Sequence, residues 1–491
     1  MKKRRKKLLL IFACTFIGTI QITGCGSAEH MKNMELLTSD IEAVKTVENI
    51  PQQDIAETEP EEVYEIVSHT PEGNASDTWN QAMNAILSVQ DKAFFAGYPI
   101  DESFLFWLME QYGEQSLIQI AKQVQTATAD VWYQTVGASL HVLWLDYCEQ
   151  VGLHPHAWTR VTRQTCASEE QTVLSFTGDM NFDDRTGTMQ QLKTEGISSV
   201  LSADVQELMK SSDIMMINNE CTFSTRGVPL PGKAYTFRSN PANVSILKEL
   251  GVDIAGIANN HVWDYGAEAV TDTIATLDDA GIANVGAGNN LEEAKRPWYF
   301  LANRKKIAIV AATQIERTYN YTKEATDTMP GVLKTLHADK FVEVIKHAKA
   351  NSDYVIAFVH WGTEGANYYE ADQVALAEQF VAAGADVIIG GHTHCLQGIS
   401  YMEDVPIIYS LGNFWFGSTP TDGVNQKDTA IAQVIINKDG SIDFRFVPCV
   451  QRNRQTYLVT DPAEKARIIA FEQQLSQGVV IDADGYVSKS N

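Results

Sequence analysis

The hydrophobic and polar positions change their pattern twice along the chain, near residue 78 and near residue 171. Between Thr78 and Arg163 apolar residues recur every three or four positions, which is the spacing of one face of an amphipathic helix. We therefore predict a small helical region over residues 78–165. Its aromatic residues are expected to form a core rather than a ligand site; they are Trp107, Trp132, Tyr133, Trp144 and Tyr147.

From Gln171 onward, short apolar runs alternate with helical stretches. This alternation predicts βα units, in which helices cover both faces of a sheet. Two late runs with alternating polarity, 430–436 and 442–450, predict antiparallel strands, so the sheet is either mixed or doubled into a sandwich. The other predicted strands are 173–177, 214–217, 252–257, 307–311, 354–359, 387–389 and 407–409. The predicted helices are 241–250, 267–280, 338–350 and 371–383.

The amino terminus has the form of a secretion signal. Six Lys and Arg residues precede an apolar run, Leu8 to Ile20, which is too short to be a confident membrane span. The next residues, Ile22 to Cys25, are similar to a bacterial lipobox. We therefore expect a lipoprotein signal peptide over residues 1–24 and a lipidated Cys25 that anchors the protein on the extracytoplasmic face of a bacterial cell membrane. The alternative is an ordinary secretory peptide with a chance cysteine.

Composition narrows the picture further. Residues 25–77 are polar and acidic with few large apolar side chains, so we predict a tether between the anchor and the helical region. The formal net charge is −24, and it becomes −30 when the six basic residues of the first 24 positions are set aside. Such a charge argues against nucleic acid as a partner. The five cysteines after Cys25 show no CxxC spacing, which argues against a disulfide framework or a thiolate zinc cluster.

A histidine pair ends one of the predicted strands. The segment 389–397, IGGHTHCLQ, places His392 and His394 directly after a buried apolar run. Because side chains two apart in an extended segment point the same way, both imidazoles could face one site. The pair lies at the carboxyl end of the predicted strand, and open α/β sheets usually hold their ligands at the carboxyl edge of the sheet. The alternative is a polar turn with no ligand.

Other strand ends carry residues with metal-ligating chemistry. Asp179 follows the first strand and Glu220 follows the second, and a buried carboxylate is costly unless it is paired or binds a metal. Glu220 could instead cap a helix or lie in a solvated turn. His360 ends a later strand.

The third strand leads into the motif ANNHVWDYG. Asn260 offers a neutral carbonyl ligand, His261 can act as an acid or a base, and Asp264 is near enough to orient that imidazole. Because the whole set holds oxygen and imidazole donors but no thiolate, it favours Mn²⁺, Fe or Zn²⁺, with Mg²⁺ and Ca²⁺ as alternatives.

Taken in order, the motifs resemble the series found in the bacterial CapA family, whose members are called poly-γ-glutamate capsule synthesis proteins. The motifs are GDMNFDDR, NNECTFS, ANNHVWDYG, HWGTE, GGHTH and SLGNF, and the match covers about residues 173–448. That family is similar in fold to the calcineurin-like metallophosphoesterases. The resemblance implies a CapA-like domain over residues 171–450, folded as a four-layer α/β/β/α sandwich with two divalent metal ions between its sheets. We assign residues 451–491 to a C-terminal helical extension.

The resemblance also implies a role for each matching residue. Asp179 and His394 would bind one metal, and Glu220 would bridge the two ions. Asn260, His360 and His392 would hold the second metal, while His261, supported by Asp264, would protonate the leaving group. Two positions depart from the broader phosphoesterase pattern, because Asn181 stands in place of a histidine and Glu220 in place of an aspartate. We therefore expect the first metal site to be weak, differently selective or partly empty.

Further polar residues are candidates for binding substrate. Arg238 could hold an anionic group by a bidentate contact or form a structural salt bridge, and Arg185 has the same two interpretations. Glu364 and Asn413 complete the substrate-binding candidates. Cys221 and Cys395 adjoin proposed ligands but lack the partners of a nucleophile, so we interpret them as packing residues.

These patterns predict a membrane-anchored, extracytoplasmic, metal-dependent hydrolase. Its substrate would be a phosphoester, or an amide of an anionic cell-envelope polymer such as poly-γ-glutamate. The alternative is a protein that binds, assembles or exports a capsule polymer without cleaving it, beside capsule-synthesis membrane proteins. His261 and Asp264 favour catalysis, because a binding site needs no proton donor. Asn181 favours the alternative.

Overall fold

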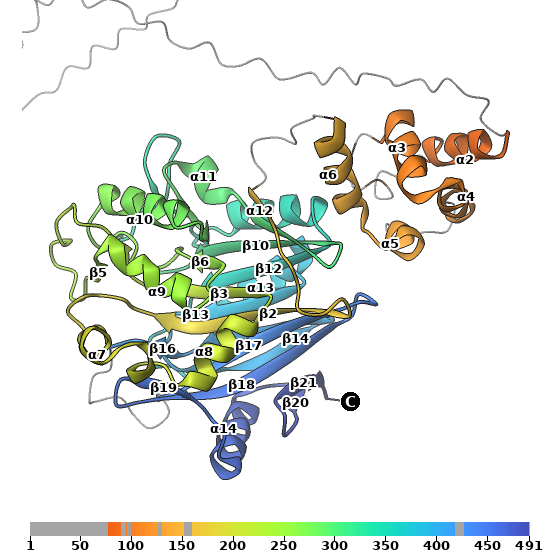
Figure 1. Cartoon of the computed structure of the whole chain (residues 1–491). Coiled ribbons are helices and arrows are strands. Elements are labelled where there is room, and N and C mark those ends of the chain that lie inside the picture. The colour runs from red at the N-terminus through yellow and green to blue at the C-terminus, as the bar shows by residue number, and fades with distance from the viewer. Residues whose placement is uncertain are drawn as a thin grey trace, which may run out of the picture. The chain divides into compact units, whose positions relative to one another are not determined.

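Two β-sheets packed face to face form the body of the chain from Arg160 onward (Figure 1). The computed structural model describes residues 77–89, 95, 98, 100–124, 130–151, 160–417 and 427–490. The predictions for the signal peptide, for the lipidated Cys25 and for the tether up to residue 76 lie outside these residues. Among the helices of the described ranges, none is long and apolar enough to cross a membrane.

The first sheet has seven strands with a parallel centre. Strands β10, β12, β13 and β15 run parallel to one another, whereas β9 and β14 pair antiparallel at the two sides. In spatial order the strands are β1 (Arg160–Arg163), β9 (Trp298–Ala302), β10 (Lys305–Thr313), β12 (Tyr354–His360), β13 (Val387–Gly391), β15 (Val405–Leu411) and β14 (Leu396–Met402).

The second sheet is mixed, as the late alternating runs predicted. Strands β2, β3, β6 and β7 are parallel, and β17 and β18 continue the sheet antiparallel. In spatial order its main strands are β20 (Val479–Ile481), β21 (Tyr486–Lys489), β18 (Ile442–Arg452), β17 (Asp428–Asn437), β2 (Gln171–Met180), β3 (Ile214–Asn219), β6 (Ile254–Gly256) and β7 (Ala283–Val285). Two short strands attach to it: β16 (Asn413–Trp415) pairs with β2, and β19 (Gln455–Leu458) pairs with β18. Two smaller pairs are β4 (Thr222–Phe223) with β5 (Arg238–Ser239), and β8 (Ala287–Gly288) with β11 (Gly331–Val332).

Strand alternation sorts the side chains into an inner core and two outer cores. In β3, Ile214 and Met216 pack between the sheets, whereas Met215 and Ile217 pack against helices. In β10, Ile309 faces the inner core while its neighbours face the other way. The helices over the second sheet are α8 (Ala203–Ser211), α9 (Val244–Glu249) and α10 (Ala267–Asp279), and those over the first are α12 (Asp339–Ala350) and α13 (Ala371–Ala383). The predicted α/β/β/α sandwich is therefore confirmed (Figure 1).

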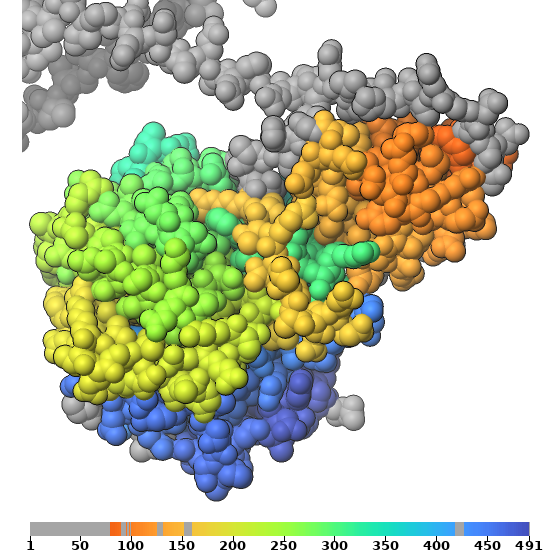
Figure 2. All heavy atoms as spheres, viewed as in Figure 1, coloured from red at the N-terminus to blue at the C-terminus, as the bar shows by residue number. Residues whose placement is uncertain are grey.

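Shorter helices fill the connections between these layers. They are α7 (Gly187–Glu195), the 3₁₀ turns η2 (Ile197–Ser199) and η3 (Pro241–Asn243), and α11 (Leu291–Lys295). In Figure 2 the blue C-terminal residues gather below the yellow and green residues that carry α7 to α9.

The helical region has its own aromatic core. Trp107, Trp132 and Tyr147 are buried there, and Trp144 packs against them half-buried. Tyr133 is different, because its ring lies 4.8 Å from the Lys305 ammonium outside that core. The helices are α2 (Asp77–Leu87), α3 (Glu102–Tyr112), α4 (Glu114–Gln123), α5 (Asp130–Val136) and α6 (Leu140–Val151).

The segment 451–491, expected to be a helical extension, holds in its described part, residues 451–490, the last two residues of β18, one helix and three short strands. The helix is α14 (Pro462–Leu475), and the strands are β19, β20 and β21. Because β21 pairs with β18, the segment continues the second sheet. Each of these strands has only three or four residues, which is too few for an alternating pattern to stand out.

Gly390 permits the close packing of β13 that the site depends on. A Cβ atom at this position would lie 1.9 Å from the Tyr409 carbonyl oxygen and 2.6 Å from Trp361 Nε1. We expect Gly390→Ala to lower the free energy of unfolding by about 3 kcal/mol, because the backbone must shift. Gly196→Ala is the control: its Cβ would meet nothing within 4 Å, so it adds only the strain of a left-handed residue, about 1 kcal/mol. Equal losses in urea unfolding would contradict this account.

Glu472 on α14 makes stability depend on pH. Its carboxylate is fully buried and neither oxygen has a hydrogen-bond partner among the described residues, so burial raises its pKa well above the ordinary value. Above about pH 4.5 the carboxyl group loses its proton in the unfolded chain but keeps it in the folded chain. Each further pH unit therefore lowers the free energy of unfolding by about 1.4 kcal/mol, until the pH reaches the pKa of the folded state. We expect the stability gained in Glu472→Gln to grow between pH 5 and pH 8. A gain that does not change with pH would contradict the raised pKa.

Candidate metal centre

The polar side chains of the site gather where the parallel strands of both sheets end. Asp179 lies near the end of β2, Glu220 follows β3, and His360 is the last residue of β12. Asn260 follows β6, and His392 follows β13. Because the two sheets pack face to face, these ends meet in the interior between them.

A glycine lets the two sheets approach at this point. A Cβ atom on Gly391 would lie 2.8 Å from Asp179 Oδ1, so no other residue type leaves room for the carboxylate. The His392 backbone N–H then donates to Asp179 Oδ2 at 3.1 Å. His392 and His394 have φ values of 97° and 58°, so the predicted extended geometry is wrong for this motif. A strained loop, rather than strand alternation, brings both imidazoles to the site.

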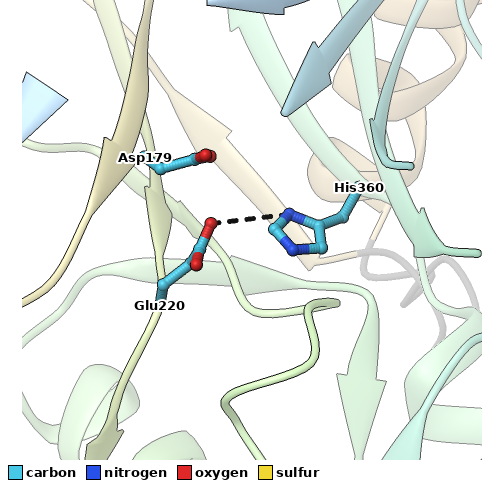
Figure 3. Close-up of side chains that lie close together, drawn as sticks. All are labelled: Asp179, Glu220 and His360. Carbon is cyan, nitrogen blue, oxygen red and sulfur yellow. Dashed lines mark ion pairs between the residues drawn. The ribbon is translucent and has the colours of Figure 1, made fainter. Parts of the chain in front are cut away.

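Asp179, Glu220 and His360 form a compact buried group (Figure 3). Their ligand atoms all lie within 4.8 Å of one another, and Glu220 Oε1 is 3.6 Å from His360 Nδ1. The Asn218 amide lies among them and donates to Asp179 Oδ1 at 2.8 Å and to Glu220 Oε1 at 3.0 Å. Asn218 therefore fixes the positions of both carboxylates, as residues behind metal ligands commonly do.

A second group forms on the other side of the His360 ring. His360 Nε2 lies 2.8 Å from Asn260 Oδ1 and 3.1 Å from His392 Nδ1. Two ligands at right angles on one ion, each roughly 2.0–2.2 Å from it, are about 3 Å apart. Both distances thus have the spacing of neighbouring ligands around one cation.

The two imidazoles have the protonation state that binds a divalent cation, whereas Glu220 would have to lose a proton to do so. Burial raises the pKa of Glu220 well above its usual value, and the charge of Asp179 adds to this. Burial lowers the pKa of His360 to about 3, against the opposing charge of Asp179, and it also lowers that of His392. Both imidazoles are therefore neutral, which is the form that binds metals. Glu220 Oε2 is buried without a hydrogen-bond partner among the described residues, so it has a lone pair free for an ion.

His394 and Asn413 complete the Asp179 side. His394 Nδ1 lies 2.8 Å from Asn413 Oδ1 and 3.3 Å from Asp179 Oδ2. Burial alone would raise the pKa of Asp179, but the hydrogen bond and charge of His394 outweigh it and lower the pKa to about 2. Asn181 instead accepts the Asp183 backbone N–H at 2.9 Å. Asn181, which stands in place of the expected histidine, thus closes a turn. The Asp179 side of the site therefore has fewer metal ligands than the phosphoesterase pattern provides.

His261 is held beside the second group by a buried network. Its Nδ1 lies 2.8 Å from Asp264 Oδ2, which also accepts the Phe237 backbone N–H at 2.6 Å. Lys233 places its ammonium 2.7 Å from Asp264 Oδ1 and 3.2 Å from Glu316 Oε1. A carboxylate can only accept, so the Nδ1 of His261 carries the proton in this arrangement and Nε2 is left for other partners.

A cavity of about 530 Å³ opens onto the second group. Asn260, His261 and His392 contribute to its lining, and so does Glu364, one of the predicted substrate-binding residues. Arg317 lines the same cavity, where it bonds to Glu370 and Asp372 at 3.0 and 2.9 Å and to the Gly362 carbonyl at 3.0 Å; it also contacts Thr363.

Arg185 and Arg238 lie outside this cavity and share a separate hollow of about 340 Å³. Arg185 makes a bidentate pair with Asp183, at 2.9 Å from Nε and 2.6 Å from Nη2. Arg238 lies over the Tyr265 ring at 4.1 Å and donates to backbone carbonyls. For Arg185 this geometry matches the interpretation as a structural salt bridge.

Cys221 and Cys395 are buried. Burial raises the pKa of both thiols, to about 11 for Cys395, so neither supplies a thiolate at neutral pH. The sequence did not indicate the roles of Asn218, Lys233 or Arg317. Asn218 stood within a recognised motif, whereas Lys233 and Arg317 lie in loops whose contacts depend on the folded chain.

Comparisons with known proteins confirm the family resemblance that the motifs indicated. Residues 173–418 match the family described as "Bacterial capsule synthesis protein PGA_cap". The "Capsule biosynthesis protein CapA" of Bacillus anthracis is 34% identical over 229 residues, which are 46% of this chain and 54% of that protein. The "PGA biosynthesis protein CapA" of Bacillus subtilis (strain 168) is 30% identical over 284 residues, which are 57% of this chain and 72% of that protein. The chain thus spans about half the length of the first relative.

Two solved structures resemble the chain more distantly. TT1561 of Thermus thermophilus has a TM-score of 0.31 and 9% identity, and the match covers 56% of this chain and 98% of that one. The 5'-nucleotidase of Candida albicans SC5314 has a TM-score of 0.31 and 11% identity, and the match covers 60% of this chain and 53% of that one.

The ligand geometry predicts that divalent metal stabilises the chain. After treatment with a chelator, we expect Mn²⁺ at a hundred times its Kd to raise the melting temperature by roughly 3–5 °C, because only the folded state binds it. His392→Ala removes one ligand and should weaken Mn²⁺ binding at least tenfold. The exposed His337 lies outside the site, so His337→Ala is the control. An identical metal-dependent shift in both variants would contradict the assigned ligand.

Proposed function

Because the chain belongs to the bacterial capsule synthesis family PGA_cap, we propose that it is a metal-dependent hydrolase of an anionic cell-envelope polymer. The bond cleaved is a phosphoester, or an amide as in poly-γ-glutamate. The observation that carries this proposal is the buried His261–Asp264 pair beside Asn260, His360 and His392. A site that only bound polymer would have no use for a proton donor held in this way.

Each residue of the site has a defined task in this proposal. Asn260, His360 and His392 would hold one divalent ion, Asp179 and His394 would contribute to a second, weaker position, and Glu220 would lie between the two. Ions bound there supply an activated water and offset the charge that develops on the attacked group. Mn²⁺, Fe and Zn²⁺ suit this mixture of imidazole and oxygen donors.

His261 moves a proton at the mouth of the cavity. Asp264 fixes the ring through Nδ1, which directs Nε2 to the substrate and sets the tautomer. Burial lowers the pKa of His261 although Asp264 opposes the shift, so the doubly protonated ring is the stronger acid and gives up its Nε2 proton readily. Lys233 and the Phe237 N–H hold Asp264 in place, so the pair does not need to reorganise during the reaction.

The location of the protein forms part of the proposal. The basic amino terminus, the short apolar run and Cys25 support a lipid anchor on the extracytoplasmic face of a bacterial membrane. There the chain would work on polymer close to the capsule-synthesis proteins of the membrane.

A second candidate function is polymer binding without cleavage. Asn181 favours it, because the carbonyl that replaces the expected histidine is occupied by Asp183 and the Asp179 side lacks that ligand. A single ion at the other position would then bind an anionic group without the second ion of a hydrolytic pair.

Substitution of the proton donor separates the two functions. With Mn²⁺ bound, we expect His261→Ala in the full chain to lower kcat on a nitrophenyl phosphodiester or on γ-linked oligoglutamate by about 10²–10⁴-fold. Metal content should stay unchanged, because His261 is not one of the assigned ligands.

His337→Ala again serves as the control and should retain the wild-type kcat. If hydrolysis is the same in His261→Ala as in the wild type, the proposed mechanism fails. If the wild type binds oligoglutamate but hydrolyses neither compound, the second candidate function holds.

A further inference from the structure

Three tyrosines line the cavity that opens onto the metal centre. Tyr235 and Tyr319 are 70% and 67% exposed, although large aromatic side chains are usually covered. Both face the same cavity as His261 and His392. Clusters of exposed aromatic surface beside a site mark places where a ligand binds.

Stacking and hydrogen bonds hold the tyrosines Tyr319 and Tyr321 in place at the cavity. The rings of Tyr319 and Tyr321 stack at a centroid distance of 5.8 Å, with 26° between their planes. The Tyr321 hydroxyl donates to the Gly232 carbonyl at 2.9 Å, and its backbone N–H donates to Glu316 at 2.9 Å. Tyr321 therefore holds the loop of Tyr319 against the loop that carries Lys233 and Tyr235.

The cations of the same cavity are already neutralised. Lys233 contacts Asp264 and Glu316, and Arg317 contacts Glu370 and Asp372. Glu364 adds a further acid to the lining. Away from the metal ligands, the described residues of the lining thus offer no free positive side chain to a row of carboxylates. A polycarboxylate chain would find charge complementarity only at the metal ions themselves.

We propose that this cavity binds a sugar ring, so that the substrate is a glycosyl phosphodiester of a cell-envelope glycan rather than a polycarboxylate. Tyrosine suits such a ligand, because its ring packs against the apolar face of a sugar and its hydroxyl bonds to the sugar hydroxyls. This inference rests on the proposed hydrolytic function for the reaction, but the binding of the sugar stands on the cavity alone.

The position of His261 decides which part of the substrate the cavity holds. Because His261 lines the cavity, the sugar there is the leaving group. Water oxygen forms a new bond to phosphorus, and the bond from phosphorus to the sugar oxygen breaks. That oxygen takes a proton from His261, and the imidazole regains one from the attacking water. The products are a phosphomonoester and a free sugar hydroxyl.

Binding of two small probes tests the inference. A neutral trisaccharide of N-acetylhexosamine units and γ-linked triglutamate are titrated into the full chain without added metal, by calorimetry. We expect the trisaccharide to bind at least tenfold more tightly than triglutamate. Tyr319→Ala should weaken trisaccharide binding at least fivefold, whereas Tyr319→Phe keeps the ring and should weaken it less than threefold. Tyr457→Ala removes a tyrosine outside the cavity and should have no effect.

The inference is overturned if triglutamate binds more tightly, if neither probe binds, or if Tyr319→Ala leaves trisaccharide binding unchanged. Because neither probe has a phosphoester, the result does not depend on catalysis. Hydrolysis of a nitrophenyl phosphodiester without trisaccharide binding would remove the sugar site and keep the hydrolase. Trisaccharide binding without any hydrolysis would keep the sugar site and remove the proposed hydrolase.

Discussion

Two carboxylates buried side by side between the sheets impose the main constraint on this structure. Asp179 and Glu220 are both fully buried, and bringing two such charges out of water is costly unless other charges or hydrogen bonds offset them. The protein does this partly with the Asn218 amide and partly with His394. Glu220 still has a raised pKa and an oxygen without a hydrogen-bond partner among the described residues. A divalent cation would offset the negative charge that these contacts leave unbalanced.

The architecture follows from that requirement. The carboxylates and imidazoles come from both sheets, so the strand ends must meet within the span of one ion. Gly391 removes the side chain that would strike Asp179, and Gly178 lets β2 pass the Gly412 carbonyl, which its Cβ would meet at 2.0 Å. Around this centre the loops add a layer of fixed partners, among them Lys233 behind Asp264. Rigid strands thus position the ligands, and loops form the cavity.

The sequence predicted the strand ends well because their signal is local. An apolar run that ends in Asp, Glu, Asn-His or His is legible without knowledge of the fold, and the inner and outer faces follow from alternation. The contacts of Lys233 and Arg317 could not be predicted from the sequence, because their partners lie in other segments and the pairs form only in the folded chain. The loop geometry of His392 and His394 was also hidden, since φ values of 97° and 58° oppose the usual preference of histidine.

The distribution of charge decides how such a protein meets an anionic substrate. The chain carries a net charge of −24, so its general field repels a polyanion at distances shorter than the screening length of about 8–10 Å. Within the cavity, Lys233 and Arg317 are each paired with two carboxylates, so they attract an anionic substrate only weakly. Attraction must then come from the metal ions, which act over a few ångströms and on one group at a time. A substrate with a single charged linkage between neutral rings matches that field better than one with a charge on every unit, because only the linkage has to approach the ions.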